Sequence, residues 1–369
     1  MPSPRITTVE QLRQYLYLAM QLEHATIPPY LLAMYSIHPG TNSDAVHVFR
    51  VVVVEEMLHL TFAANILNAV SDPTKKYPSG STPDLTTKGF VPLYPAGLPD
   101  GEEDFKVDLQ KFSKSAVDTC LKIERPGKAP DEGHRIVSRK RAGATPLGVC
   151  PGVADLHFYS IGEFYEEIER GLEYLSAQYK KEGKELFIGD PARQVTPEFY
   201  YSGGGELFAV TDIETARAAI HLIIGQGEGI GWEIYNTENE LAHYFRFQQL
   251  QLGKYYQAGD KPDAPTGPPV NVDWDAVYPM KTNARLADYA GSSELHDAAV
   301  AFNQGYAEFL ALLTAAYNGN PKLLLDAVPK MFTLRNKINQ LIHNPIPGLD
   351  GVNAAPTFEI SNAPSEVAS

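Results

Sequence analysis

Apolar residues recur at helical spacing through the first seventy residues of the chain, which predicts two consecutive helices. The first covers about residues 8–37, with Thr7 or Thr8 as its cap, and the second covers about 44–70. Residues 38–44 between them include Pro, Gly, Asn and Ser, a composition typical of a stop, a turn and a restart. The two helices should therefore pack side by side as a hairpin.

The rest of the chain alternates between helical patterns and long polar stretches. Residues 71–153 and 253–292 are rich in Pro, Gly and Asp and are expected to be irregular insertions, the first with some short strands. The glycines in residues 225–231 should bend or break a helix. Residues 346–369 form a tail rich in Pro, Asn, Ser and Ala. Further helices are predicted at about 112–124, 155–180, 212–224, 240–252, 293–317 and 321–342.

The composition narrows the class of protein and its partners. The chain has 369 residues and is 44% hydrophobic, which is enough to bury a large core. Its net charge of −14 argues against nucleic acid or an anionic membrane as the main partner, because both repel an acidic surface. The two cysteines, Cys120 and Cys150, have no metal-binding spacing, and the N-terminus has no signal-peptide pattern. We therefore expect a cytoplasmic protein that neither binds nucleic acid nor spans a membrane.

Charged residues interrupt the apolar patterns of the first two helices. Glu23 and the pair Glu55-Glu56 lie in otherwise apolar helices, where an unpaired buried charge would cost several kcal/mol. Glu56 and His59 form a Glu-x-x-His element, whose two side chains share one face of a helix. Such an element, joined by a lone Glu from a partner helix, is how ferritin-like bundles hold two metal ions.

The distances along the hairpin support this pairing. Glu23 lies 18 residues before Thr41 in the turn, and Glu56 lies 15 residues after it. The mismatch of three residues is about 4–5 Å of helical rise, so the two carboxylates should fall at nearly the same depth. Pro28 and Pro29 cannot donate to the carbonyls of the preceding turn, so the helix should be distorted beside the site.

A second half-site is expected from the later helices. Glu163 lies about 18 residues before its helix ends and Glu228 about 16 residues after its helix begins, so their depths agree. His243 is the proposed last nitrogen ligand, provided that residues 229–241 loop out of the helix. The rival to Glu228 is Glu240, which with His243 forms an uninterrupted Glu-x-x-His element.

Neighbouring polar residues receive other interpretations. Glu55 is expected to support a ligand or to face solvent, and His24 to be a hydrogen-bonded core histidine. Tyr30, Tyr165 and Tyr244 lie close in sequence to the expected ligands and are candidates to hydrogen-bond them. The chain has no phosphate-binding loop, nucleophile elbow or haem-attachment motif, so no competing chemistry is indicated.

Seven short motifs are spread over most of the chain, and they are specific as a set. They are Leu22-Glu-His-Ala-Thr-Ile-Pro-Pro-Tyr-Leu31, Glu55-Glu-Met-Leu-His-Leu60, Ile123-Glu-Arg-Pro126, Ile161-Gly-Glu-Phe-Tyr165, Gln226-Gly-Glu-Gly229, His243-Tyr-Phe-Arg-Phe247 and Ala355-Pro-Thr-Phe-Glu359. Together they resemble the ferritin-like domain of the iminophenyl-pyruvate dimer synthase family. Members of that family oxidatively couple aryl-pyruvate imines in violacein, rebeccamycin and staurosporine biosynthesis.

The resemblance implies a fold and a set of ligands. The fold is all-α: a ferritin-like four-helix bundle in a single domain, residues 1–345, that carries the two insertions and two extra C-terminal helices before the irregular tail. Position by position, it favours Glu228 over Glu240. The metal ligands that it implies are Glu23, Glu56, His59, Glu163, Glu228 and His243.

These observations predict a metal-dependent oxidoreductase whose carboxylate and imidazole donors hold two iron ions, with manganese as the alternative metal. Glu56 or Glu228 would bridge the ions, and His59 and His243 would bind one each. The expected reactants are dioxygen and a small organic molecule, such as an amino-acid-derived or aryl-pyruvate imine. A homo-oligomer is compatible with this hypothesis. The alternatives are an iron-storage protein, a helical binding protein without catalysis, and a zinc hydrolase.

Overall fold

The regular structure of the protein is helical. The computed structural model describes residues 5–76, 80, 82–97, 105–127, 158, 160–201, 203–229 and 233–360, and in these ranges β-structure is limited to isolated bridges. The predicted helices are confirmed, with boundaries within three residues except for the helix predicted at 155–180, which begins at Ile161; residues 155–157 of that prediction lie outside the described residues. They are α1 (Val9–Ser36), α2 (Ser43–Ala69), α3 (Lys114–Ile123), α4 (Ile161–Lys181), α5 (Ile213–Gly227), α6 (His243–Leu252), α7 (Ser293–Tyr317) and α8 (Leu323–Ile342).

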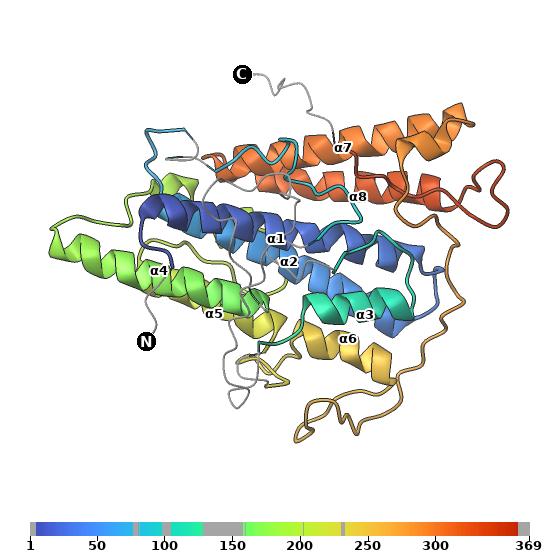
Figure 1. Ribbon diagram of the computed structural model, residues 1–369, viewed down its shortest axis with the longest axis horizontal. Coiled ribbons are helices and arrows are strands. Elements are labelled where there is room, and N and C mark those ends of the chain that lie inside the picture. The colour runs from blue at the N-terminus through green and yellow to red at the C-terminus, as the bar shows by residue number, and fades with distance from the viewer. Residues whose placement is uncertain are drawn as a thin grey trace.

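Helices α1 to α6 form a four-column bundle in which two columns are split. The long helices α1 and α2 pack against each other along their length and make two of the columns. Helices α3 and α4 both pack on α1, and α5 and α6 both pack on α2. Since α3 pairs with α6 and α4 pairs with α5, the third column is α3 followed by α4, and the fourth is α5 followed by α6 (Figure 1). The fold class is therefore the predicted helical bundle.

The two breaks lie at one level of the bundle. Helix α3 ends at Ile123 with Glu124 as its C-cap, and α4 begins after the N-cap Ser160. Helix α5 ends with Glu228 as its C-cap, and α6 begins at His243. The side chain of Glu228 accepts a hydrogen bond from the backbone N–H of Gly127, so the two breaks are joined directly. Residues 233–242 lie outside the helix, as the looped-out interpretation requires.

The prolines of α1 are accommodated without ending the helix. Pro28 and Pro29 both lie inside α1, which continues to Ser36. Pro29 has no N–H for the carbonyl of Ala25, and the buried hydroxyl of Tyr94 donates to that carbonyl instead, at 2.7 Å. The segment that carries Tyr94 therefore supplies the donor that is missing at the Ala25 carbonyl, two residues after Glu23.

Helices α7 and α8 pack together and lie on the side of α1 and α2 away from α4 and α5 (Figure 1). Buried hydroxyls attach α7 to the bundle: Tyr306 lies 2.9 Å from His24 Nε2, and Tyr317 lies 3.1 Å from the hydroxyl of Thr61. The described part of the tail is irregular, and its residues 354–358 are buried, with Phe358 packing on α7. These extra helices close the face of α1 that lies next to His24.

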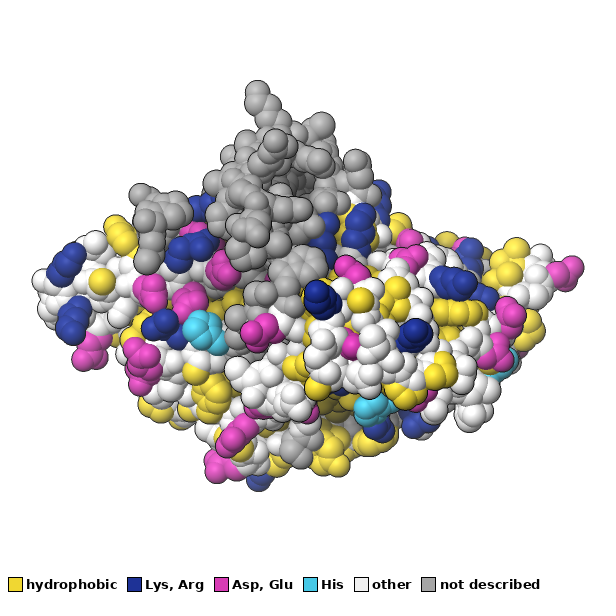
Figure 2. Space-filling model, turned by 90° about the horizontal axis from the view of Figure 1, so that it is seen from below, with side chains coloured by type: hydrophobic (Ala, Val, Ile, Leu, Met, Phe, Trp, Pro, Cys, Tyr) yellow, Lys and Arg dark blue, Asp and Glu magenta, His cyan; other side chains and the backbone are white. Residues whose placement is uncertain are grey.

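The surface carries both signs of charge. In Figure 2, acidic and basic side chains are interspersed over the described part of one face. Among the described residues, no helix is both long enough and apolar enough to cross a membrane. Cys120 is a buried free thiol on α3, and Cys150 lies outside the described residues.

Replacing Tyr94 should test how α1 tolerates its prolines. Tyr94→Phe leaves the buried Ala25 carbonyl without its donor, so we expect a loss of about 1–3 kcal/mol in the free energy of unfolding. Urea unfolding followed by circular dichroism measures it. Tyr201→Phe is the matched control, because the Tyr201 side chain is 69% exposed and its loss should be neutral. Equal stability of the two variants would contradict the assignment.

Candidate metal centre

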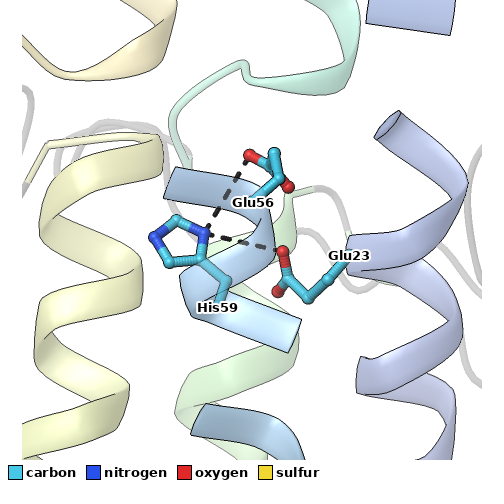
Figure 3. A group of neighbouring side chains, drawn as sticks. All are labelled: Glu23, Glu56 and His59. Atoms are coloured by element: carbon cyan, nitrogen blue, oxygen red, sulfur yellow. Dashed lines mark ion pairs between the residues drawn. The ribbon is translucent and has the colours of Figure 1, made fainter. Parts of the chain in front are cut away.

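The first group of potential ligands joins α1 to α2. Figure 3 shows Glu56 and His59 on α2 and Glu23 on the neighbouring α1, with the ring nitrogen Nδ1 of His59 facing both carboxylates. This nitrogen lies 3.6 Å from Glu23 Oε2 and 3.9 Å from Glu56 Oε1. All three side chains are buried, and they offer ligand atoms within 4.8 Å of one another. Glu23 and Glu56 therefore lie at nearly the same depth in the hairpin, as the residue count from the turn predicted.

The second group lies on the other side of Glu56. Nδ1 of His243, the first residue of α6, is 3.1 Å from Glu56 Oε1 and 3.3 Å from Glu124 Oε2. Glu56, Glu124 and His243 are all buried and again lie close enough to hold one ion. The same oxygen of Glu56 faces both histidines, while its other oxygen accepts a hydrogen bond from Thr26 at 2.9 Å. Glu56 is thus the carboxylate that the two groups share.

One tyrosine holds the unshared carboxylate of each group. Tyr165 of α4 donates to Glu23 Oε1 at 2.5 Å, and Tyr30 of α1 donates to Glu124 Oε1 at 2.5 Å. The two hydrogen bonds run in opposite directions between the same two columns. Tyr165 in the third column donates to Glu23 of α1, and Tyr30 of α1 donates to Glu124 in the third column. In both groups the remaining carboxylate oxygen is left facing a histidine. Tyr244, the third candidate, accepts a hydrogen bond from Gln248 at 3.4 Å.

The outer ring nitrogens of the two histidines are also held. His59 Nε2 lies 2.8 Å from Gln226 Oε1, an atom that can only accept, so Nε2 carries the proton. His243 Nε2 lies 2.7 Å from Glu55 Oε2, a carboxylate that accepts in the same way. A protonated Nε2 leaves Nδ1 as the nitrogen that can bind a metal once its own proton is lost. Glu55 therefore has the supporting position that was one of its two interpretations.

Burial and crowding shift the pKa values within the two groups. Burial and the charge of Glu124 raise the pKa of Glu56 to about 8. Although burial opposes ionisation, the hydrogen bond and charge of His59 hold the pKa of Glu23 below its usual value. Burial likewise opposes protonation of His243, yet the neighbouring Glu124 raises the pKa of this histidine well above its usual value. Glu56 and His243, which face other carboxylates, therefore retain their protons to higher pH than exposed glutamate and histidine side chains do.

The structure places the other expected ligands differently. The Glu228 carboxylate accepts hydrogen bonds from the backbone N–H groups of Gly127, at 2.9 Å, and Gly162, and burial raises its pKa to about 7. Glu163 is half-buried in the first turn of α4. Neither carboxylate belongs to the two groups found among the described residues. Glu240, the rival, is exposed and lies 3.7 Å from Arg246.

Sequence reasoning did not select Glu124 as a ligand, because it lies in the stretch expected to be an insertion, although it belongs to the quoted motif Ile123-Glu-Arg-Pro126. Two features could have found it. The predicted short helix ends at this residue, and a carboxylate at a helix C-terminus is electrostatically unfavourable, which calls for a compensating role. Glu163, by contrast, occupies the N-terminal turn of α4, where a negative charge is favourable without any metal.

Comparison with known proteins agrees with the bundle. A family model described as ferritin-like matches residues 16–252, which is more than half of the chain and covers the six bundle helices apart from the first residues of α1. The chain belongs to the ferritin-like family. Its structure is similar to that of a ferritin-like protein from Caulobacter vibrioides, with a TM-score of 0.57 and 21% identity, covering 91% of this chain and 96% of that chain. At this identity the likeness shows the fold alone. None of the curated proteins compared matches the sequence significantly.

The residues of this ferritin-like protein fit a pair of divalent cations. The buried carboxyl groups of the centre belong to Glu23, Glu55, Glu56, Glu124 and Glu228, whereas its buried imidazoles belong only to His59 and His243. Even with both imidazoles protonated, ionised carboxylates would leave an excess of buried negative charge, which is costly. Cations bound by the two groups would remove that excess. Oxygen and imidazole donors suit iron or manganese, and the iminophenyl-pyruvate dimer synthase assignment stays a prediction.

The stability of this ferritin-like protein, freed of metal by a chelator, should fall as pH rises from 7 to 8.5. The raised pKa values of Glu56 and His243 mean that the folded chain holds protons that the unfolded chain releases in this window. His24, whose burial lowers its pKa to about 3, acts in the opposite direction but only below its unfolded value near 6.5. We expect Tm to fall on the order of 2–4 °C per kcal/mol lost.

Differential scanning fluorimetry of the chelated protein at several pH values measures this slope. Glu56→Gln removes the carboxyl group whose pKa is raised to about 8, so the fall of Tm with pH should be smaller in this variant. A Tm that rises across the same window would contradict the protonation pattern.

Proposed function

We propose that this ferritin-like protein is an oxidoreductase that binds two iron ions and uses dioxygen to oxidise a small organic molecule. The observation that carries the proposal is the Glu56 carboxylate, one oxygen of which faces His59 on one side and His243 on the other. A shared carboxylate between two buried Glu-His groups is the arrangement that two adjacent ions require. Bound iron would supply redox chemistry with dioxygen that side chains alone lack.

The protein's own residues have separable roles in this proposal. Glu23 and His59 would hold one ion, Glu124 and His243 the other, and Glu56 both. Tyr165 and Tyr30 fix the orientation of Glu23 and Glu124 by donating to one oxygen of each. Because all these side chains are buried, they keep bulk water away from the groups and strengthen every electrostatic interaction among them.

In this proposal Glu228 has a different part from the ligand or bridging role expected of it. Its carboxylate is occupied by the amides of Gly127 and Gly162, and an added Cβ at Gly162 would lie only 2.5 Å from Glu228 Oε2. Its part in the proposed enzyme is to fasten the break in the third column to the break in the fourth. Glu124 would then take the ligand position that Glu163 was expected to fill.

The substrate class rests on the motif resemblance alone. The residues shared with iminophenyl-pyruvate dimer synthases favour an amino-acid-derived imine, formed from an aryl-pyruvate, as the molecule oxidised. Oxygen uptake by the iron-loaded protein, measured with and without such imines, tests this class directly. Uptake that no imine accelerates would leave the two-iron proposal in place and remove the substrate class.

The metal content of a Glu56→Gln variant tests the two-ion proposal. The amide keeps the shape of the side chain but loses the shared negative charge, so the iron content should fall from about two ions per chain to less than about one. Elemental analysis after anaerobic loading with iron(II) and desalting measures this content. Glu240→Gln is the control, since that carboxylate is 49% exposed and should be dispensable.

Three outcomes separate the possible functions. About two ions in the control and a loss in Glu56→Gln support the dinuclear centre. Equal metal content in both variants contradicts it. Iron in large excess over two ions per chain, deposited in air, would point to storage in place of substrate oxidation.

A further inference from the structure

A segment of three consecutive glycines, Gly203–Gly205, lies against the two residues that hold the outer nitrogens of both histidines. It lies in the connection between α4 and α5 and is partly exposed to solvent. We propose that this triglycine segment is the element that positions His59 and His243 together, through Gln226 and Glu55. The proposal rests on the metal centre described above and concerns how its histidines are set.

The first contact reaches His59. The backbone carbonyl of Gly204 accepts a hydrogen bond from Gln226 Nε2 at 2.6 Å, which fixes which way the Gln226 amide points. The amide oxygen is thereby directed at His59 Nε2, 2.8 Å away. Gly205 also lies beside this amide, since a Cβ on Gly205 would be 3.2 Å from Gln226 Nε2. The position of the segment therefore determines the hydrogen bond that orients the His59 ring.

The second contact reaches His243. A Cβ on Gly204 would lie 2.9 Å from Glu55 Cγ and 3.0 Å from Glu55 Cα, so the backbone of Gly204 rests directly on Glu55. Glu55 Oε2 lies 2.7 Å from His243 Nε2. The Glu55 carboxylate cannot rotate toward the segment without meeting it. One residue, Gly204, is thus in contact with the supports of both histidines.

The conformation of the segment explains why its residues are glycines. Gly204 has φ +76° and Gly205 has φ +126°, both in the region that favours glycine. Gly203 leaves room for Val54, because a Cβ there would lie 2.6 Å from Val54 Cγ1. A side chain on Gly203 or Gly204 would push the segment away from Val54 or Glu55 of α2, and one on Gly205 would displace the Gln226 amide or Leu58.

Histidine supports of this kind have measurable effects. Partners that fix the ring orientation and protonation of a metal-bound histidine change metal affinity by roughly 10- to 100-fold when they are lost. Gly204→Ala should therefore weaken binding at both groups by roughly this factor. Gly205→Ala disturbs Gln226 but faces Leu58 rather than Glu55, so it should weaken only the group that contains His59.

Gly183 offers a matched control for backbone strain. It has φ +67°, similar to Gly204, but nothing lies within 4 Å of a Cβ added there. Gly183→Ala imposes the left-handed strain of an alanine without touching the centre. Any difference in metal binding between Gly204→Ala and Gly183→Ala therefore reports contact with Gln226 and Glu55 and not strain alone.

Cobalt(II) titration of the purified full-length variants tests the proposal, with visible absorption as the readout of ligand geometry. We expect Gly204→Ala to bind both ions roughly 10- to 100-fold more weakly and with an altered spectrum. Gly183→Ala should match the wild type. If Gly204→Ala binds with the affinity and spectrum of Gly183→Ala while Glu56→Gln loses binding, the positioning role is overturned and the metal centre stands.

Histidine nitrogen NMR of the metal-free protein separates this proposal from the metal centre itself. The Nε2–H protons of His59 and His243 should exchange slowly in the wild type and in Gly183→Ala, and faster in Gly204→Ala. This comparison decides the positioning role even if the wild type binds no cobalt, a result that would overturn the proposed function. Equal exchange in all three proteins would overturn the positioning role. Should Gly204→Ala fail to fold, Gly205→Ala carries the same comparison for His59 alone.

Discussion

The burial of several carboxylates at one level of the bundle is the constraint on which the rest of the structure depends. Glu23, Glu56 and Glu124 are each nearly inaccessible to water and face two imidazoles. Unpaired charges in such surroundings would cost several kcal/mol each, so the centre must hold either protons or cations. The raised pKa of Glu56 describes the first state, with protons retained by the crowded groups. In the second state, cations occupy the two groups. Because a cation replaces the retained protons, metal binding and proton release are coupled.

The two split columns are a consequence of building this centre. An unbroken helix presents a ligand from its side, whereas a helix end also exposes unpaired backbone N–H or C=O groups and can turn the chain. Glu124 and Glu228 stand at the C-terminal ends of α3 and α5, and His243 opens α6. The amides that receive Glu228 belong to Gly127 and Gly162, on either side of the break between α3 and α4. Each break thus supplies a side chain to the centre and a partner to the other break.

The helices of the fold could be predicted from the sequence, because a helix that buries one apolar face has apolar residues at a spacing of about 3.6 residues. One half of the site could be predicted as well. Glu23, Glu56 and His59 lie on two helices joined by a short turn, so their depth in the hairpin follows from counting residues from the turn. The other half depends on where interrupted helices resume. Position 124 is separated from α4 by more than thirty residues, and no count along the chain can show that Ile123 and Ile161 belong to one column. Depth matching selected Glu163 and Glu228 for the same reason, although the amides of Gly127 and Gly162 hold the Glu228 carboxylate and Glu163 lies in the N-terminal turn of α4.

The two halves of the centre are alike in their inner contacts and unlike in their outer ones. Each pairs a tyrosine-bound glutamate with a histidine, yet His59 is supported by the neutral amide of Gln226 and His243 by the carboxylate of Glu55. A carboxylate partner makes an imidazole more basic and a better donor to a cation than an amide partner does. Two ions held by these halves would therefore experience different ligand fields despite matching ligand types. Such a difference suits chemistry in which the two ions are not interchangeable, and it originates in residues adjacent to the ligands rather than in the ligands themselves.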